Sequence, residues 1–235
     1  MLILAIDTST SAIGVGLSDG ESVLGAAHRI EARGHTEHLA PLVAALLRDV
    51  GTGVGDLTGL VVGTGPGPFT GLRVGMVTGL TMGHALGVRV HGMCSLDVLA
   101  HQALCLECGP GRSDHRLRTR GEVLVATDAR RREVYWARYL PGTGPGAHDG
   151  VVRVGDPAVD RPAELPPGVR SLPTAGRGPV LYPDLFPNPL DPLDVDAGLL
   201  ALLGARRVAS AEPMPVEPLY LRRPDALTTA ERATP

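Results

Sequence analysis

The sequence predicts an α/β fold in two lobes, a larger first lobe with a partly parallel sheet and a smaller second lobe. Strand and helix patterns follow one another as βββ-α-β-α-β-α over residues 1–108. Strands that alternate with helices favour a partly parallel sheet whose faces are covered. A polar, glycine-bearing stretch at 109–120 then precedes two more strand patterns. We therefore expect a surface loop at 109–120, a second lobe at 121–212 and an extended, proline-led tail at 213–235.

The first three strands are predicted to form an antiparallel meander. An apolar run at 2–6 is followed by residues 13–17, which alternate between apolar and small side chains, and by a third strand at 23–28. Asp19-Gly20 separates the last two patterns and is a strong hairpin-turn signal.

The rest of the first lobe alternates between helix and strand. Apolar residues recur at helical spacing in three stretches, and two short apolar runs between them have the length of buried strands. The helices are predicted at 33–50, 69–86 and 95–106, and the strands at 59–64 and 88–92. Ser95 is expected to cap the last of these helices.

Patterns in the second lobe are shorter. Strands are predicted at 122–127 and 133–140, with short ones near 151–154 and 170–172 and one helix at 194–207. Prolines are dense between 157 and 192, which disfavours long regular elements there.

The helix at 69–86 carries a glycine at every fourth position. Residues four apart lie on one helical face, so these glycines form a ridge without side chains: Gly71, Gly75, Gly79 and Gly83. Each glycine costs about 0.8–1 kcal/mol relative to alanine, so something is expected to pack closely against the ridge. Only Arg73 and His84 are chargeable on this helix, which predicts burial on nearly all sides. The ridge faces either the chain's own sheet or a partner.

Composition excludes several kinds of chemistry. All 22 basic residues are arginine, so a phosphate-binding, Schiff-base or general-base lysine is excluded. A net charge of −3 and 3% aromatic residues argue against a global nucleic-acid field and against base-stacking platforms. Three cysteines do not make a disulfide framework. The N-terminus lacks the basic region of a signal peptide, and no apolar run reaches the roughly 18 residues of a membrane span. We expect a cytoplasmic protein that does not contact membranes.

Two acidic residues at strand ends are candidates for phosphate loops. Asp7 is followed by Thr8 and Ser9, and an acid with small hydroxylated neighbours suits Mg²⁺ and phosphate. The same residues would also close a tight turn. Asp128 opens the second lobe's hairpin, but Arg130 stands where a phosphate loop favours glycine.

Glycine-rich turns provide two weaker candidates. Gly176 and Gly178 fit the remnant of a turn on the adenosine side of a nucleotide site. The turn at 65–71 precedes a helix N-terminus, where phosphate can bind, but Pro66 and Pro68 remove two of its N–H groups. We expect this second turn to set the chain direction rather than to hold an anion.

Histidine and cysteine patterns do not favour a metal site. His35 and His38 flank Glu37 near a helix start, but the sequence contains neither HExxH nor HxxxH. A single CxxC, at Cys105 and Cys108, runs into a glycine-rich loop. We therefore expect no metal.

Five stretches resemble the TsaB (YeaZ-like) family, whose members were once described as glycoprotease homologues. They are LAIDTSTSAIGVGL, RGHTEHLAPLVAALL, GTGPGPFTGLRVG, VATDARRREVYWARY and EPLYLRRPDA. The resemblance covers about residues 1–140 and 213–226, and GPGPFTGLR and DARRREVY are its most specific motifs.

The resemblance implies an actin-like ATPase (ribonuclease-H-like) fold with a degenerate second lobe, and a non-catalytic scaffold role. TsaB pairs with TsaD, which transfers threonylcarbamoyl to N6 of adenosine 37 in tRNA, and the ATPase TsaE joins them. We therefore expect a TsaD heterodimer, tRNA contact only through that complex, and a homodimer in isolation. No cofactor is expected for the chain itself, although a nucleotide at the heterodimer contact stays open.

TsaB pairs through its first two helices, which correspond here to about 35–50 and 69–86. The missing HxxxH pair, the missing glycine after Asp128 and the absence of lysine all agree with a non-catalytic chain. The predicted partner-interface residues are His35, His38, Leu42, Leu46, Arg73, Gly75, Met76, Gly79, Leu80 and Gly83.

Two other functions stay open from the residues alone. Asp7 and its hydroxylated neighbours would also suit an active ATP-dependent small-molecule kinase or ATPase of the same superfamily. His35, Glu37 and His38 would suit an M22-type metallopeptidase.

Overall fold

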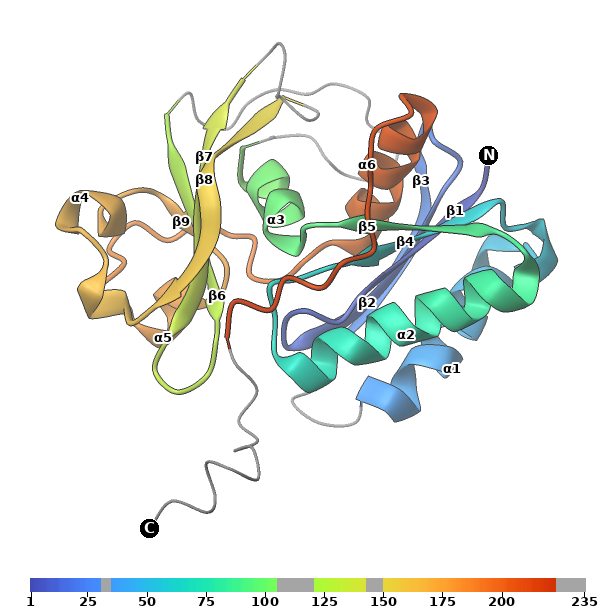
Figure 1. The fold of residues 1–235 in the computed structure, drawn as a ribbon, viewed down its shortest axis with the longest axis horizontal. Coiled ribbons are helices and arrows are strands. Elements are labelled where there is room, and N and C mark those ends of the chain that lie inside the picture. The colour runs from blue at the N-terminus through green and yellow to red at the C-terminus, as the bar shows by residue number, and fades with distance from the viewer. Residues whose placement is uncertain (31–34, 105–120, 143–149, 223–235) are drawn as a thin grey trace, which may run out of the picture.

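The computed structural model describes residues 1–30, 35–104, 121–142 and 150–222. Within these ranges the chain forms two sheets, with helices on the outer face of the first sheet and between the two sheets (Figure 1). The predicted two-lobed α/β fold is confirmed. No helix in these ranges is long and apolar enough to span a lipid bilayer. The predicted surface loop at 109–120 lies outside the described residues.

The first sheet has the strand order β3-β2-β1-β4-β5. β1 (Ile3–Asp7), β2 (Ala12–Ser18) and β3 (Val23–Ile30) form the antiparallel meander that the sequence predicts. β4 (Gly59–Gly63) pairs parallel with β1, and β5 (Arg89–Met93) pairs parallel with β4. β1 and β4 are buried along their whole length, as central strands covered on both faces are.

α1 (His35–Val50) and α2 (Phe69–Leu86) lie side by side over one face of this sheet (Figure 1). α1 packs on β2 and β3, whereas α2 packs on β1, β4 and β5. A short 3-10 helix, η1 (Val54–Asp56), leads into β4. Both helices and all five strands thus occupy the stretches in which the sequence predicts them.

α6 (Ala197–Ala209) covers the opposite face of the first sheet, where it contacts β1, β2 and β3. The sequence-based division places this helix in the second lobe, with 121–212, but the structure places it on the first sheet. Gly16 of β2 permits the close approach, because a Cβ atom there would lie 2.1 Å from the Ala197 carbonyl oxygen.

The second sheet has the order β8-β7-β6-β9. β6 (Val123–Asp128), β7 (Val134–Pro141) and β8 (Val151–Asp160) form a second antiparallel meander. β9 (Thr174–Ala175) adds a short parallel strand on the other side of β6.

The proline-dense part of the second lobe differs from the prediction. The strand expected near 170–172 is wrong, since a helix, α4 (Pro167–Arg170), ends there and β9 comes only afterwards. Two residues of β9 form a strand because they pair with Leu124 and Val125 of β6, a contact that no local pattern encodes. The remaining short helices are η2 (Pro162–Glu164) and α5 (Gly178–Leu181).

α3 (Ser95–Leu104) lies between the two sheets and packs on both the second sheet and α6 (Figure 1). One hydrophobic cluster therefore spans both lobes. It contains Ile3, Ala5 and Val61 from the first sheet, Val123, Val125, Ala137 and Tyr139 from the second, and Leu96, Leu99, Leu200 and Leu203 from the two helices.

The described part of the tail, residues 213–222, is extended and joins the two lobes. Two backbone hydrogen bonds hold it to the first lobe: the Gly92 N–H donates to the Met214 carbonyl at 3.0 Å, and the Leu219 N–H donates to the Thr64 carbonyl at 2.9 Å. Arg222 then donates to the Ala129 carbonyl at 2.9 Å and forms an ion pair with Glu133, both in the turn between β6 and β7.

Candidate functional site

Asp7 ends β1, and its side chain is engaged inside the protein. Oδ1 accepts hydrogen bonds from the Ser9 N–H at 2.9 Å and the Ser9 hydroxyl at 2.7 Å, and Oδ2 accepts one from the Ser95 hydroxyl at 2.6 Å. Asp7 is 1% exposed. Burial raises the pKa of Asp7, although the bonds from Ser95 and Ser9 oppose that rise. Ser95, expected as a helix cap, instead supports this carboxyl group.

Thr8 is the next residue of the candidate phosphate loop, and its hydroxyl also binds within the protein. It donates to the Gly71 carbonyl at 2.7 Å and accepts from the Gly75 N–H at 3.0 Å. These two backbone groups are one helical turn apart, so Thr8 ties the loop to the first turns of α2. The residues predicted as a phosphate loop thus form a turn whose polar groups are used internally.

The turn after Asp128 is closed in a similar way. Asp128 Oδ1 accepts the Arg130 N–H at 2.7 Å, and Oδ2 pairs with the Arg130 guanidinium at 3.3 Å. Arg130, Arg131 and Arg132 all have left-handed backbones, with φ values of 62°, 51° and 64°. A phosphate loop would use glycine in this conformation, whereas here three arginines adopt it.

Gly176 and Gly178 pack against the backbone of β6. A Cβ atom added at Gly176 would lie 2.4 Å from the Ala126 carbonyl oxygen, and one added at Gly178 would lie 2.7 Å from the Ala126 Cβ. The Gly176 N–H donates to the Pro192 carbonyl at 2.7 Å. These glycines therefore serve close packing, and the Gly176 N–H is already engaged within the second lobe.

The fold brings the candidate loops of the two lobes together, as the phosphate-loop prediction requires, but leaves little space between them. Thr10 and Ser11 of the first lobe face Asp128, Arg130 and Arg177 of the second around a cavity of about 10 Å³. That volume is comparable with a single water molecule. It does not accommodate a nucleotide.

The glycine ridge of α2 faces the chain's own sheet. A Cβ atom added at Gly75 would lie 2.4 Å from Thr8 Oγ1. One added at Gly79 would lie 2.3 Å from Val62 Cγ1, and one added at Gly83 would lie 2.3 Å from Val90 Cγ2. The assignment of these three glycines to a partner interface is therefore corrected. They let the helix backbone lie directly on β1, β4 and β5.

The other predicted interface residues divide into two groups. Leu46 and Met76 are buried in the cluster between the first sheet and its outer helices, so the structure contradicts their assignment to a partner surface. Leu80 and Arg73 are exposed, and His38 and Leu42 are half-buried. His35 begins α1, and its side chain lies outside the described set. Sequence reasoning missed Val77, which is the more exposed apolar residue of α2 at 57%, against 45% for Leu80.

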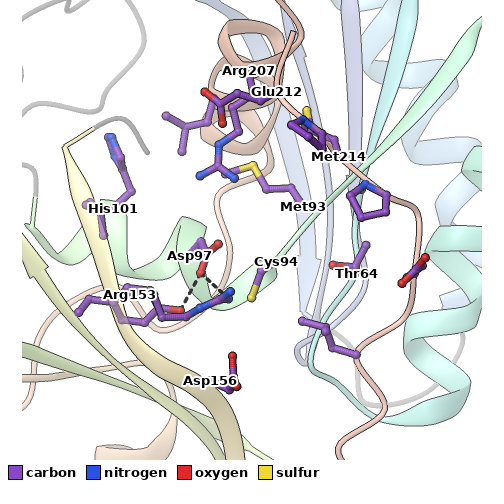
Figure 2. Close-up of a pocket in the computed structure, with 18 of the residues that line it drawn as sticks. Thr64, Met93, Cys94, Asp97, His101, Arg153, Asp156, Arg207, Glu212 and Met214 are labelled. Carbon is purple, nitrogen blue, oxygen red and sulfur yellow. Dashed lines mark hydrogen bonds and ion pairs between the residues drawn. The ribbon is translucent and has the colours of Figure 1, made fainter. Parts of the chain in front are cut away.

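A larger cavity lies elsewhere, between β5, α3, β8, α6 and the tail, and has a volume of about 560 Å³ (Figure 2). Asp97 projects from α3 into its lower part, where Oδ1 accepts hydrogen bonds from the Tyr139 hydroxyl at 2.9 Å and the Arg153 guanidinium at 3.1 Å. Sequence reasoning could not find this cavity, because its walls come from segments of both lobes that are far apart in the sequence, including β5, α3, β8, α6 and the tail.

The chemistry of this cavity is not that of an evident catalytic centre. Burial raises the pKa of the Cys94 thiol well above its ordinary value, and the nearby Asp97 raises it further. Burial also raises the pKa of Tyr139. Neither group is therefore an activated nucleophile, and the Asp97 carboxylate is already paired with Arg153.

Metal-ligand candidates are dispersed. Among the described residues, no group of three or more His, Cys, Asp and Glu side chains is arranged to hold a metal ion. His101 is buried on α3, whereas Cys105 and Cys108 lie outside the described ranges.

A family model matches more than half of the chain. It is described as TsaD: tRNA N6-adenosine threonylcarbamoyltransferase, and it matches residues 23–168.

Relatives in bacteria extend this similarity over nearly the whole chain. An uncharacterized protein of Mycobacterium tuberculosis strain H37Rv is 42% identical over 95% of this chain and 93% of its own length. An uncharacterized protein of Mycobacterium leprae is 41% identical over 96% of this chain, which spans only 56% of that longer relative. The tRNA threonylcarbamoyladenosine biosynthesis protein TsaB of Escherichia coli K12 is 39% identical over 59% of this chain and 55% of its own length.

Solved structures share the fold. YeaZ from Pseudomonas aeruginosa superposes with a TM-score of 0.73 at 27% identity, covering 94% of this chain and all of that one. A second Pseudomonas aeruginosa structure, described as similar to peptidase YeaZ, gives a TM-score of 0.75 at 27% identity over 94% of this chain and 99% of that one. The family match, the relatives and the shared fold together show that this chain belongs to the TsaD family and is a YeaZ/TsaB-like protein.

Proposed function

We propose that this protein is a non-catalytic subunit of the machinery that forms threonylcarbamoyladenosine in tRNA, and that it acts by binding a TsaD protein. Its similarity to a named TsaB protein supports a role in this modification. The TsaD partner, the participation of the ATPase TsaE and a cytoplasmic location belong to the same proposal.

One observation carries the non-catalytic part of the proposal. The loops at which an active ATPase or kinase would hold phosphate enclose only about 10 Å³. Asp7 is bound by Ser9 and Ser95, and Asp128 is bound by Arg130. A chain with this interior is suited to support a catalytic partner, because the space between these loops is too small for a nucleotide's phosphates.

The outward side of α1 and α2 is the proposed docking face, defined here by exposed Ala40, Ala44, Val77, Leu80 and Thr81. Because the glycines of α2 contact the sheet, the partner would contact the opposite side of that helix. Small residues on α1 beside two apolar ones on α2 offer a surface that another helix can approach closely. The same face would pair two copies of the chain when no TsaD is present.

Val77→Glu tests this face, because it places a charge at the centre of the proposed contact. Val180→Glu is a matched control, since Val180 is 60% exposed on α5 of the other lobe, against 57% for Val77. We expect Val77→Glu to remain folded but to lose co-purification with TsaD and threonylcarbamoyladenosine formation by at least about tenfold, as central interface residues do. Mass spectrometry of tRNA nucleosides from a reconstituted reaction measures the second effect.

The control decides how the result is interpreted. Val180→Glu should retain both pairing and product formation. If both variants pair normally with TsaD, the docking face is wrong. If the wild-type chain neither binds TsaD nor supports product formation, the proposed function itself is wrong.

A further inference from the structure

We propose that Arg73, near the start of α2, binds a carboxylate of the TsaD partner at one end of the docking face. Arg73 is exposed and lies four residues before Val77, and residues four apart share one side of a helix. The arginine therefore lies on the same outward side of α2 as the apolar centre of the docking face. This inference rests on the proposed TsaD docking and adds the chemical group that the partner presents there.

Two aromatic side chains hold Arg73 in place. Its guanidinium carbon lies 3.7 Å from the centroid of the Phe69 ring, which is a cation–π arrangement. Its Nε donates a hydrogen bond to the Tyr220 hydroxyl at 3.2 Å, and the two rings have centroids 5.0 Å apart. A free arginine side chain loses conformational entropy when a partner immobilises it. These contacts order the side chain beforehand, which lowers that cost of binding.

Tyr220 belongs to the tail, which is fixed on both sides of this residue. The Leu219 N–H donates to the Thr64 carbonyl at 2.9 Å, and the Arg222 guanidinium donates to a backbone carbonyl of the β6–β7 turn at 2.9 Å. The tail is thus anchored to both lobes while its tyrosine lies against α2. In this proposal Tyr220 is a positioning residue, because it acts on the partner through Arg73.

The outer edge of the Arg73 guanidinium group is available to a partner. Within the described ranges Arg73 forms no ion pair, and Nε is the only guanidinium nitrogen that donates a hydrogen bond. The first turn of α2 also contains no acidic residue. The two Nη groups lie in one plane and match the two oxygens of a carboxylate. A partner carboxylate would therefore bind without displacing a contact within this chain.

A protein carboxylate suits this position better than an RNA phosphate. The outward side of α2 continues from Arg73 to Val77 and Leu80, which are exposed and apolar. An apolar centre with polar groups at its rim is typical of a protein–protein contact. Surfaces that follow a nucleic-acid backbone instead carry several basic groups, whereas His84 is the only other chargeable residue of this helix.

Surface plasmon resonance with the full-length chain and the TsaD protein of the same genome, at about 0.1 M and about 0.5 M NaCl, tests this contact. We expect Arg73→Gln, which keeps a good helix former, to weaken the affinity by about tenfold at the lower salt concentration. The loss should shrink to about threefold or less at the higher one, because salt screens an ion pair at the rim of an interface. Arg161→Gln makes the same change at an exposed residue of the second lobe and should stay within about twofold at both.

Tyr220→Phe tests the positioning role, because it removes the hydroxyl that accepts the Arg73 Nε bond and keeps the ring. We expect it to weaken TsaD binding by about threefold. In an Arg73→Gln chain the same substitution should change the affinity by less than about 1.5-fold, since its effect passes through the arginine. An equal loss in both backgrounds would show that the hydroxyl serves only the structure of the tail.

The outcomes separate this contact from docking itself. The carboxylate contact is wrong if Arg73→Gln and Arg161→Gln have equal effects, or if the loss caused by Arg73→Gln is unchanged at the higher salt concentration. Normal binding by Arg73→Gln beside lost binding by Val77→Glu overturns the contact and leaves the docking face intact. If Arg73→Gln weakens only the binding of tRNA to the assembled complex, the arginine binds a phosphate and the proposal fails. A wild-type chain that binds no TsaD overturns both proposals.

Discussion

Asp7 is an ionisable residue whose two carboxylate oxygens are both hydrogen-bonded inside the protein. Its burial raises its pKa, so the ionised form is less favourable in the folded chain than in water. Ser9 is adjacent in sequence and was predictable as a partner. Ser95 comes 88 residues later, which is why the residues alone favoured a closed turn but left a phosphate loop open.

Asp7→Asn removes the charge and keeps the shape. The folded-state pKa lies above the ordinary value of 3.8, so the wild-type chain binds more protons folded than unfolded between those two values. The stability of the wild type relative to Asp7→Asn therefore falls as the pH rises from about 3.8 through the folded-state pKa. Above that pKa the difference in stability no longer changes with pH. The free energy of unfolding of each chain can be measured with urea at a series of pH values. We expect the value for Asp7→Asn minus the value for the wild type to increase with pH.

Asp7→Ala is the companion measurement for the same site. It leaves the Ser9 and Ser95 donors without their acceptor, and we expect a loss of about 1–3 kcal/mol. If the Asn-minus-wild-type difference instead decreases with pH, the folded protein stabilises ionised Asp7, and a role for this carboxylate in binding a cation would have to be reconsidered.

α2 shows how one helix can be covered on one side and open on the other. Its glycines contact the first sheet, whereas Val77 and Leu80 point outward. The sequence showed that the ridge needs a close neighbour, because each glycine weakens the helix. It could not show which neighbour, since Val62 and Val90 become adjacent to the ridge only when β4 and β5 pair.

Gly79→Leu tests the packing of this element. Its Cβ atom alone would lie 2.3 Å from Val62 Cγ1 on a buried strand, so the helix must move away from the sheet. We expect destabilisation of about 1–3 kcal/mol or more in urea unfolding, despite the higher helix propensity of leucine. Thr81→Leu, at an exposed position of the same helix, should be near neutral. A Gly79→Leu chain as stable as wild type that fails to bind TsaD would show that the ridge faces the partner after all.

The elements of the first lobe could be predicted because each has a clear local pattern. β1 is a continuous apolar run, β2 alternates between apolar and small residues, and α1 has apolar residues at helical spacing. The candidate site was harder, since the residues that define its cavities are brought together by long-range contacts. The pairing of Asp97 with Arg153 and the bidentate ion pair of Arg177 with Asp194 have no local signature.

At the scale of the whole molecule, the two lobes are mechanically connected. α3 and α6 fill the space between the sheets, and the tail bonds to β5 before Arg222 reaches the β6–β7 turn. The return of α6 to the first sheet means that the chain crosses between lobes more often than the sequence division at 121 and 212 suggested. Lobes with a common core should not open independently as separately folded domains do.

Cooperative unfolding is therefore the expected behaviour of the whole chain. The single tryptophan, Trp136, lies on β7 and donates to Asp160, so its fluorescence reports the second sheet. Far-ultraviolet circular dichroism reports mainly the helices, of which the long ones α1, α2 and α6 pack on the first sheet. Because one cluster includes residues of both sheets, the two signals should have the same urea midpoint.

Phe186→Ala removes a buried ring from the second lobe's own cluster, and its cost of about 3–5 kcal/mol should lower both midpoints equally. Leu46→Ala removes a buried side chain from the first lobe's cluster beneath α1, and it should also lower both midpoints equally. If each variant moves only the signal of its own lobe, the shared cluster does not couple the lobes, and each lobe unfolds by itself.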